Sequence, residues 1–153
     1  MPRKKKTMPI KTHESYMVEI TGWASSYSVS TNPERRFGEG PYHEHNAITI
    51  TGVLVEPDKL VGREIRAYLM ADRYMSQAVV SDEVYEREPT SVGVLTSRGG
   101  RSSYSGFLPH DAFPTILTML AAGKYRYLLL HGLMLRYGTA RIKYCRLGED
   151  REE

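Results

Sequence analysis

The chain has 153 residues, of which 41% are apolar and 25% charged, a balance typical of one globular domain. Its single cysteine, Cys145, excludes an intrachain disulfide and any zinc site built from several cysteines. The longest apolar runs are too short to span a bilayer, and no apolar segment follows the basic N-terminus. We therefore expect a cytoplasmic protein without membrane contact.

The net charge of +3 is distributed unevenly. Basic residues crowd the first eleven positions, which predicts a disordered basic tail over residues 1–13, and "EDREE" predicts an acidic tail over 149–153. Residues 14–148 are expected to form a single β-rich domain. From Ala112 to Gly148 there are six basic residues and no acidic one, so the C-terminal third should present a basic surface.

Alternation of apolar and polar residues predicts the first strands. "SYMVEITGW" places Tyr16, Val18 and Ile20 on one face, and "SYSVST" extends the pattern beyond a break at Ala24 and Ser25. A loop with Asn-Pro and two glycines follows. The next strand, "AITITGVLVE", contains Gly52, which indicates a bulge or a close backbone approach.

The middle of the chain predicts three more strands. "REIRAYLMAD" is interpreted as a strand rather than a helix, because its apolar residues recur at every second position. "DEVYEREP" is polar and is interpreted as a loop. "SVGVLT" and "SSYSGFL" flank Gly99 and Gly100, which supply the positive φ that a tight hairpin turn requires.

One helix is predicted over residues 111–122. Its apolar stripe has the spacing i, i+3, i+4 and i+7 and consists of Phe113, Ile116, Leu117 and Leu120. Asp111 is the expected N-cap and Pro114 suits the first turn, where amides have no intrahelical partner. Gly123 suits the C-terminal end.

Two strands close the domain. "KYRYLLLH" alternates Leu128 and Leu130 against Tyr127 and Leu129. In "GTARIKYCRL" the alternation predicts that Ala140, Ile142 and Tyr144 point inward. Arg141 and Lys143 are predicted to point outward, and Cys145 lies on their side of the strand. Seven short strands and one helix predict a mostly β fold, either an antiparallel β-sandwich or a small barrel, with the helix at an end or flank.

His43 and His45 are the candidate metal ligands. On a strand the two imidazoles point the same way and Glu44 the opposite way, a geometry that can supply two ligands to zinc or iron. The pair is similar to the start of the cupin motif, but the next acidic residue is Glu56, too distant for the third cupin ligand. A third ligand would have to come from elsewhere in the chain, the candidates being Glu39, His13, His110 and His131.

The stronger signal is the basic, tyrosine-rich C-terminal third. Cationic groups bind phosphates and aromatic rings stack on bases, and small β-barrels combine the two to bind single strands. The candidate partner-binding residues are Tyr125, Arg126, Tyr127, Arg141, Lys143, Tyr144 and Arg146. The alternative is a solvated face, since Lys and Arg also protect sheet edges.

Three functional hypotheses follow. The first is a non-enzymatic β module that binds a macromolecule, with nucleic acid as one candidate partner, through this basic face. The second is a structural or interaction protein, for example a homo-oligomer formed through an unpaired edge strand. The third is a cupin-like, metal-dependent enzyme that uses His43 and His45. We favour a function without catalysis and expect no cofactor.

Overall fold

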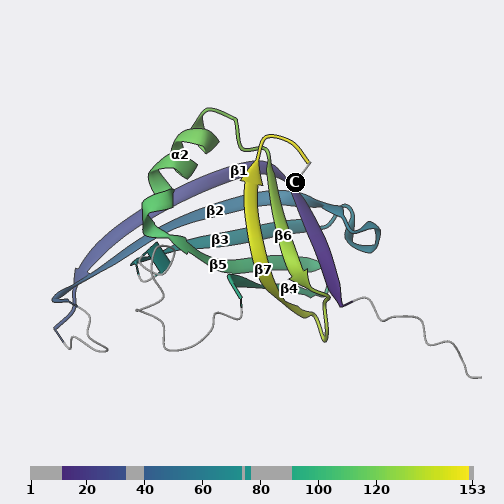
Figure 1. Ribbon diagram of the computed structural model, residues 1–153, viewed down its shortest axis with the longest axis horizontal. Coiled ribbons are helices and arrows are strands. Elements are labelled where there is room, and N and C mark those ends of the chain that lie inside the picture. Colours follow the sequence, from purple (N-terminus) through teal and green to yellow (C-terminus); the bar gives the residue numbers. More distant parts are fainter. Residues whose placement is uncertain (1–11, 34–39, 74, 77–90, 152–153) are drawn as a thin grey trace, which may run out of the picture.

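The computed structural model describes residues 12–33, 40–73, 75–76 and 91–151 (Figure 1). "DEVYEREP", most of the basic N-terminal tail and the last two residues lie outside these ranges. Thr12 and His13 are described, and His13 already pairs with Leu133 at the start of the first strand.

Seven strands form one mixed sheet that closes into a ring (Figure 1). The order around the ring is β1-β2-β3-β5-β4-β7-β6. The strands are β1 (His13–Thr31), β2 (Tyr42–Glu56), β3 (Glu64–Asp72), β4 (Gly93–Arg98), β5 (Arg101–Pro109), β6 (Tyr127–Leu133) and β7 (Thr139–Gly148). The β-rich class and the number of strands are confirmed, and of the two architectures left open the barrel is the one observed.

One pair of strands departs from the antiparallel expectation. β5 pairs parallel to β3, whereas every other neighbouring pair in the ring is antiparallel. The reason is that β4 lies beyond β5 in the ring, so the hairpin β4–β5 returns its second strand against β3. The sequence predicted the hairpin but contained no signal for the strand against which it would pack.

The core lies inside the ring and follows the predicted alternation. Tyr16 and Val18 of β1 are fully buried, as are Leu128 and Leu130 of β6. In β3, Ile65, Ala67 and Leu69 are buried, whereas the residues between them are not. This alternation confirms the strand interpretation of "REIRAYLMAD", whose first residue, Arg63, precedes the strand. Such a ring leaves alternate side chains of each strand on the outer surface, where any binding site on a strand must lie.

β1 runs without the predicted break at Ala24 and Ser25, so that expectation is wrong. The two irregularities in its pairing with β2 lie earlier, between Met17 and Val18 and between Ile20 and Gly22. Gly52 stands opposite Ile20, and a Cβ at Gly52 would collide with the backbone of Glu19 and the side chain of Val18. The close backbone approach predicted at Gly52 is therefore confirmed.

β1 and β2 extend beyond the ring as a two-stranded ribbon (Figure 1). β6 pairs with β1 only as far as Glu19, and β3 pairs with β2 only from Ala47 onward. Beyond these points the two strands pair with each other up to Thr31 and Tyr42. We call the part formed by Gly22–Thr31 and Tyr42–Asn46 the ribbon.

The helix α2 (Phe113–Ala121) follows a 3-10 turn, η3 (His110–Ala112), and buries Phe113, Ile116 and Leu120 in the barrel core. Asp111 is not its N-cap, so that prediction is wrong. The 3-10 turn continues directly into the helix, Ala112 occupies the cap position, and no side chain caps the helix. Gly123 adopts the expected positive φ of 68° after the helix.

The turn between β4 and β5 has the expected character. Gly99 and Gly100, between β4 and β5, have φ values of 58° and 80°, which confirms the predicted hairpin turn. The connection between β2 and β3 contains the short 3-10 turn η2 (Asp58–Leu60), whose Leu60 joins the core.

The side of β7 that faces the core changes part-way along the strand. Ala140 and Ile142 point inward as predicted, but the pairing with β6 shifts between Gly132 and His131. After this shift Tyr144 is exposed and Cys145 packs against the core, the reverse of the expected orientation. Burial raises the pKa of the Cys145 thiol to about 12, as is typical of a structural rather than a reactive cysteine.

Candidate nucleic-acid interface

The predicted metal pair lies on the ribbon. His43 and His45 pair with Ser30 and Ser28 of β1, and both are exposed. Glu39, considered as a third ligand, lies outside the described residues. Within the described ranges no three His, Cys, Asp or Glu side chains are grouped so that they could hold a metal ion. The described part of the chain therefore adds no third ligand to the pair.

Glu44, between the two histidines, connects the ribbon to the barrel. Its carboxylate accepts hydrogen bonds from the Tyr27 hydroxyl and from the Arg73 guanidinium, each at 2.6 Å, and His110 Nε2 lies 3.4 Å away. The hydrogen bond from Tyr27, followed by that from Arg73, holds the pKa of Glu44 below its usual value. Three segments distant in the sequence therefore meet at one carboxylate.

Most of the predicted basic residues lie on the outer side of β6 and β7, which we call the β6–β7 face. The cross-strand pairs Leu129–Arg146 and His131–Tyr144 define it, with Tyr127 at one end and Arg141 and Lys143 at the other. Tyr125 packs partly against the core instead, and Arg126 is exposed just before β6. The structure therefore brings together five of the seven predicted residues.

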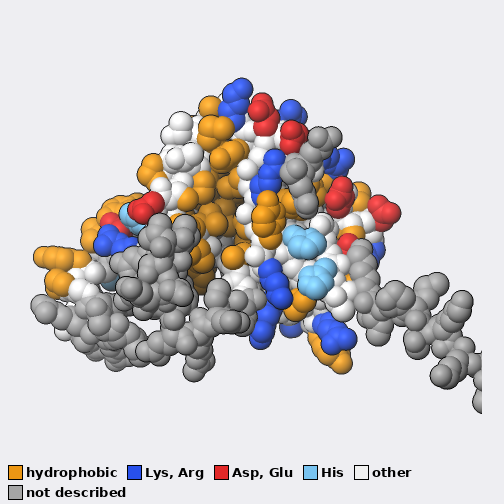
Figure 2. All heavy atoms as spheres, viewed as in Figure 1, with side chains coloured by type: hydrophobic (Ala, Val, Ile, Leu, Met, Phe, Trp, Pro, Cys, Tyr) orange, Lys and Arg blue, Asp and Glu red, His pale blue; other side chains and the backbone are white. Residues whose placement is uncertain are grey.

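Acidic residues accompany part of the β6–β7 face. Arg146 lies 3.5 Å from Asp150, and Lys124 lies 3.8 Å from Glu149. The guanidinium of Arg151 lies 5.9 Å from the ring centre of Tyr127, over the same aromatic face that a base would need. Figure 2, which views the molecule from this side, shows basic, acidic and hydrophobic side chains intermixed. The predicted surface is thus partly neutralised by the C-terminal segment.

A second surface, which the sequence did not single out, lies on the outer side of β2, β3, β5 and β4. We call it the cleft face. Two rows of side chains cross it, because paired residues on neighbouring strands share a side. The first row is Thr51–Arg66–Ser103–Thr96, and the second is Thr49–Tyr68–Ser105–Val94.

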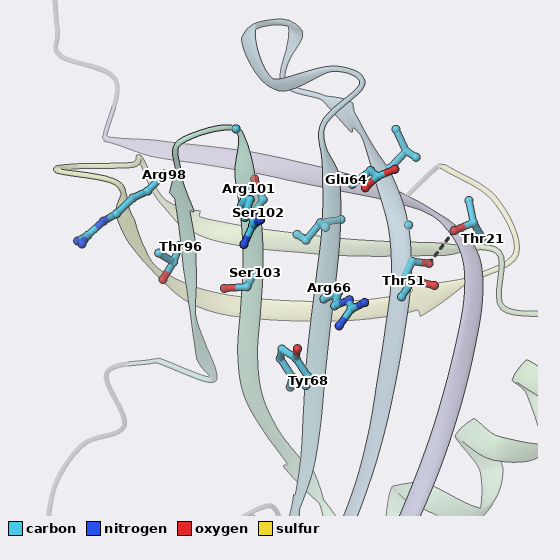
Figure 3. A pocket seen from close by; sticks show the side chains of 14 residues that line it. Thr21, Thr51, Glu64, Arg66, Tyr68, Thr96, Arg98, Arg101, Ser102 and Ser103 are labelled. Atoms are coloured by element: carbon cyan, nitrogen blue, oxygen red, sulfur yellow. Dashed lines mark hydrogen bonds between the residues drawn. The ribbon is translucent and has the colours of Figure 1, made fainter.

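The first row lines a cleft of about 890 Å³ (Figure 3). Arg66 and Tyr68 project from β3, with Thr51 on one side and Ser103 and Thr96 on the other. Arg66 is exposed, and Tyr68 is 39% exposed. A long cation and a ring thus stand among short hydroxyl side chains, which leaves both of them accessible to a ligand.

Cations predominate on the cleft face. Arg66, Arg101 and Arg98 line the cleft, and among the described residues that line it the only acidic one is Glu64 at the start of β3. Arg98 turns away from the centre and donates hydrogen bonds to the Tyr137 carbonyl and the Thr139 hydroxyl, at 3.1 and 3.4 Å (Figure 3). Arg66 and Arg101 are therefore the two guanidiniums best placed to meet an anion.

The two surfaces meet at β7. Arg141, one of the predicted binding residues, pairs with Val94 of β4 and so continues the second row of the cleft face. Phe107 of β5 lies two residues beyond Ser105, on the same side of the strand, and is 46% exposed. The outer surface of β3, β5 and β4 therefore presents two accessible rings, Tyr68 and Phe107, together with Arg66 and Arg101, and borders Arg141 of β7.

The sequence contained a signal for this surface. In "REIRAYLMAD" the polar side of the predicted strand already carried Glu64, Arg66 and Tyr68, and in "SRGGRSS" the arginines flanked the predicted turn. What the sequence lacked was the adjacency of β3 and β5, the one parallel pair, which places these two segments side by side.

Among the described helices, none has the length and apolar character needed to cross a membrane. Comparisons with protein families, curated proteins and solved structures found no match to this chain.

Proposed function

We propose that the protein binds single-stranded nucleic acid along the cleft face, with the strand continuing toward Arg141 on β7. The observation that carries the proposal is the juxtaposition of Arg66, Arg101 and Tyr68 in a cleft whose described lining residues include one acidic side chain. Guanidiniums bind phosphates, and this attraction does not depend on sequence.

The aromatic residues favour a single strand over a duplex. Tyr68 and Phe107 are 39% and 46% exposed on the outer surface of adjacent strands. Exposed rings stack on unpaired bases, with an effect of about 1–3 kcal/mol per base, whereas bases in a duplex already stack on each other. Small β-barrels commonly bind oligonucleotides on the outer face of their strands.

The hydroxyl side chains around the cations suit the same ligand. Thr51, Ser103 and Thr96 are short and partly exposed, and a hydroxyl can donate to a phosphate or accept from a base amino group. None of these hydroxyl groups can form the bidentate hydrogen bonds by which a side chain recognises one particular base. We therefore expect binding with little sequence preference.

The test is fluorescence anisotropy with labelled oligo(dT) and oligo(U) of about 20 nucleotides. This length exceeds the binding site of roughly 4–16 nucleotides that a small barrel of the OB-fold type covers. The wild-type protein should bind both at low salt. Arg66→Gln combined with Arg101→Gln should weaken binding roughly 100-fold, since a hydrogen bond to a charged group contributes about 1.5 kcal/mol. The slope of log affinity against log salt should fall by about 1.4, since each phosphate contact to a single strand contributes about 0.7.

The matched control removes two positive charges elsewhere, by Arg126→Gln combined with Arg146→Gln. If it weakens binding as strongly as the first double variant, net charge rather than the cleft face is responsible. If the wild-type protein shows no affinity for either oligonucleotide at low salt, the nucleic-acid proposal is wrong.

A further inference from the structure

One edge of β1 is open along the ribbon. The backbone amide of Ile20 donates to the Arg126 carbonyl at 2.9 Å, and within the described part of the chain no further backbone partner outside β2 follows. Every residue from Trp23 to Thr31 is exposed. Since alternate amides and carbonyls of a strand point to each side, this edge presents a row of backbone groups that have no backbone partner among the described residues.

The edge lacks the features that normally prevent strands from pairing. Natural edge strands are protected by lysines, prolines, inward-pointing charges or short length. The segment Gly22–Thr31, "GWASSYSVST", contains no charged residue and no proline. It also exposes Tyr27 by 60% and Val29 by 59%.

The same segment is chemically symmetric about Ser28. In an antiparallel pair of two copies centred there, Ser28 faces Ser28, Tyr27 faces Val29, Ser26 faces Ser30, and Ser25 faces Thr31. Small polar residues thus meet small polar residues, and each tyrosine meets a β-branched residue, a favourable cross-strand pair. This self-complementarity indicates a second copy of the chain as the occupant of the edge.

The ribbon's other strand is less accessible to a partner. Glu44 of β2 is bound by Arg73, which follows β3, and lies beside His110. The ribbon also carries no lysine or arginine, so nucleic acid has no cation to contact there.

We propose that two copies of the chain pair through the β1 edges of their ribbons, antiparallel and related by a two-fold axis at Ser28. The dimer joins two barrels by one continuous ladder and leaves both cleft faces open. It does not depend on the nucleic-acid proposal, because no residue of Trp23–Thr31 lines the cleft.

The test is the mass of the full chain in solution, measured by light scattering and sedimentation over a range of concentrations. The expected species has twice the 17.4 kDa of one chain. Ser28→Lys should raise the dimer dissociation constant at least about tenfold. The two-fold axis places the introduced lysine of one copy directly opposite that of the other, so two positive charges repel each other. Ser28→Glu should do the same.

An equal mixture of the Ser28→Lys and Ser28→Glu variants should recover the dimer, since opposite charges now face each other; this recovery excludes misfolding as the cause of the loss. The control is Val61→Lys, which adds the same charge at a valine that is 55% exposed outside the ribbon and should leave the mass unchanged. A monomer at all concentrations, or a dimer that Ser28→Lys leaves intact, would overturn the proposal.

Discussion

The two halves of β1 show how one strand can be both core and surface. Tyr16, Met17 and Val18 all pair with β6, Met17 and Val18 also pair with β2 on the other side, and all three side chains are buried. From Trp23 to Thr31 the strand pairs with β2 alone and every side chain is exposed. The residue types are similar, with a tyrosine and a valine in each half. Pairing on both sides and closure of the ring, not the local sequence, make the first half part of the core.

The two valines offer the sharpest test of this comparison. Val18 is fully buried, whereas Val29 is 59% exposed. Val18→Ala should lower the free energy of unfolding by about 2 kcal/mol, from two buried methyl groups at ~0.8 kcal/mol each plus the cavity left behind. Val29→Ala should change it by less than about 0.5 kcal/mol. Urea denaturation of dilute protein measures both, and equal effects would contradict the division of β1 into two parts.

The two tyrosines extend the comparison to hydrogen bonds. The hydroxyl of Tyr16 donates to the Leu133 carbonyl at 3.0 Å from a buried ring. Tyr16→Phe should cost about 1–2 kcal/mol, because the carbonyl loses its partner in a site with little water. Tyr27→Phe should leave the unfolding midpoint unchanged, since its partner Glu44 keeps Arg73 and is reached by solvent.

The dependence of stability on alkaline pH provides a second test of the burial of Tyr16. Burial raises its pKa from 10.0 to about 12, so the folded state keeps a proton that the unfolded state loses. Stability should therefore be fully present below pH 10 and fall as pH rises toward 12. Tyr16→Phe should reduce this slope, whereas Val18→Ala, which does not titrate, should lower stability equally at each pH.

Much of the barrel could be predicted from the sequence, because alternation records which side of a strand is buried. The pattern in Tyr16, Val18, Leu128 and Leu130 predicted the inner side of β1 and β6, and Gly99 with Gly100 predicted a hairpin. Alternation fails where a register shift changes the side, as at Tyr144 and Cys145 of β7. One extra residue in a strand reverses every side chain beyond it, and here the signal was in the partner strand, where Gly132 stands at the shift.

The candidate site was harder to predict than the fold, because it depends on which strands are neighbours. Arg141 was identified from local charge, and the structure places it at the border of the cleft face. Arg66 and Ser103 lie far apart in the sequence and meet only through the parallel pair β3–β5. Counting charges within residues 112–148 also left out Asp150, which lies beside Arg146 on the β6–β7 face.

The smallest expected effect concerns how the ribbon is held. The Tyr27 hydroxyl, and then Arg73, lower the pKa of Glu44, so this contact contributes stability above the ordinary pKa of a glutamate and loses it as pH falls through the lowered value. Tyr27→Phe should raise the Glu44 pKa, measured by NMR of the side-chain carboxyl. Tyr42→Phe, at an exposed ribbon tyrosine, is the control and should not. Trp23, the single tryptophan, lies on the ribbon, so its emission should change with acid over the same pH range in which Glu44 titrates. An unchanged Glu44 pKa in Tyr27→Phe would show that Arg73, rather than Tyr27, lowers the Glu44 pKa.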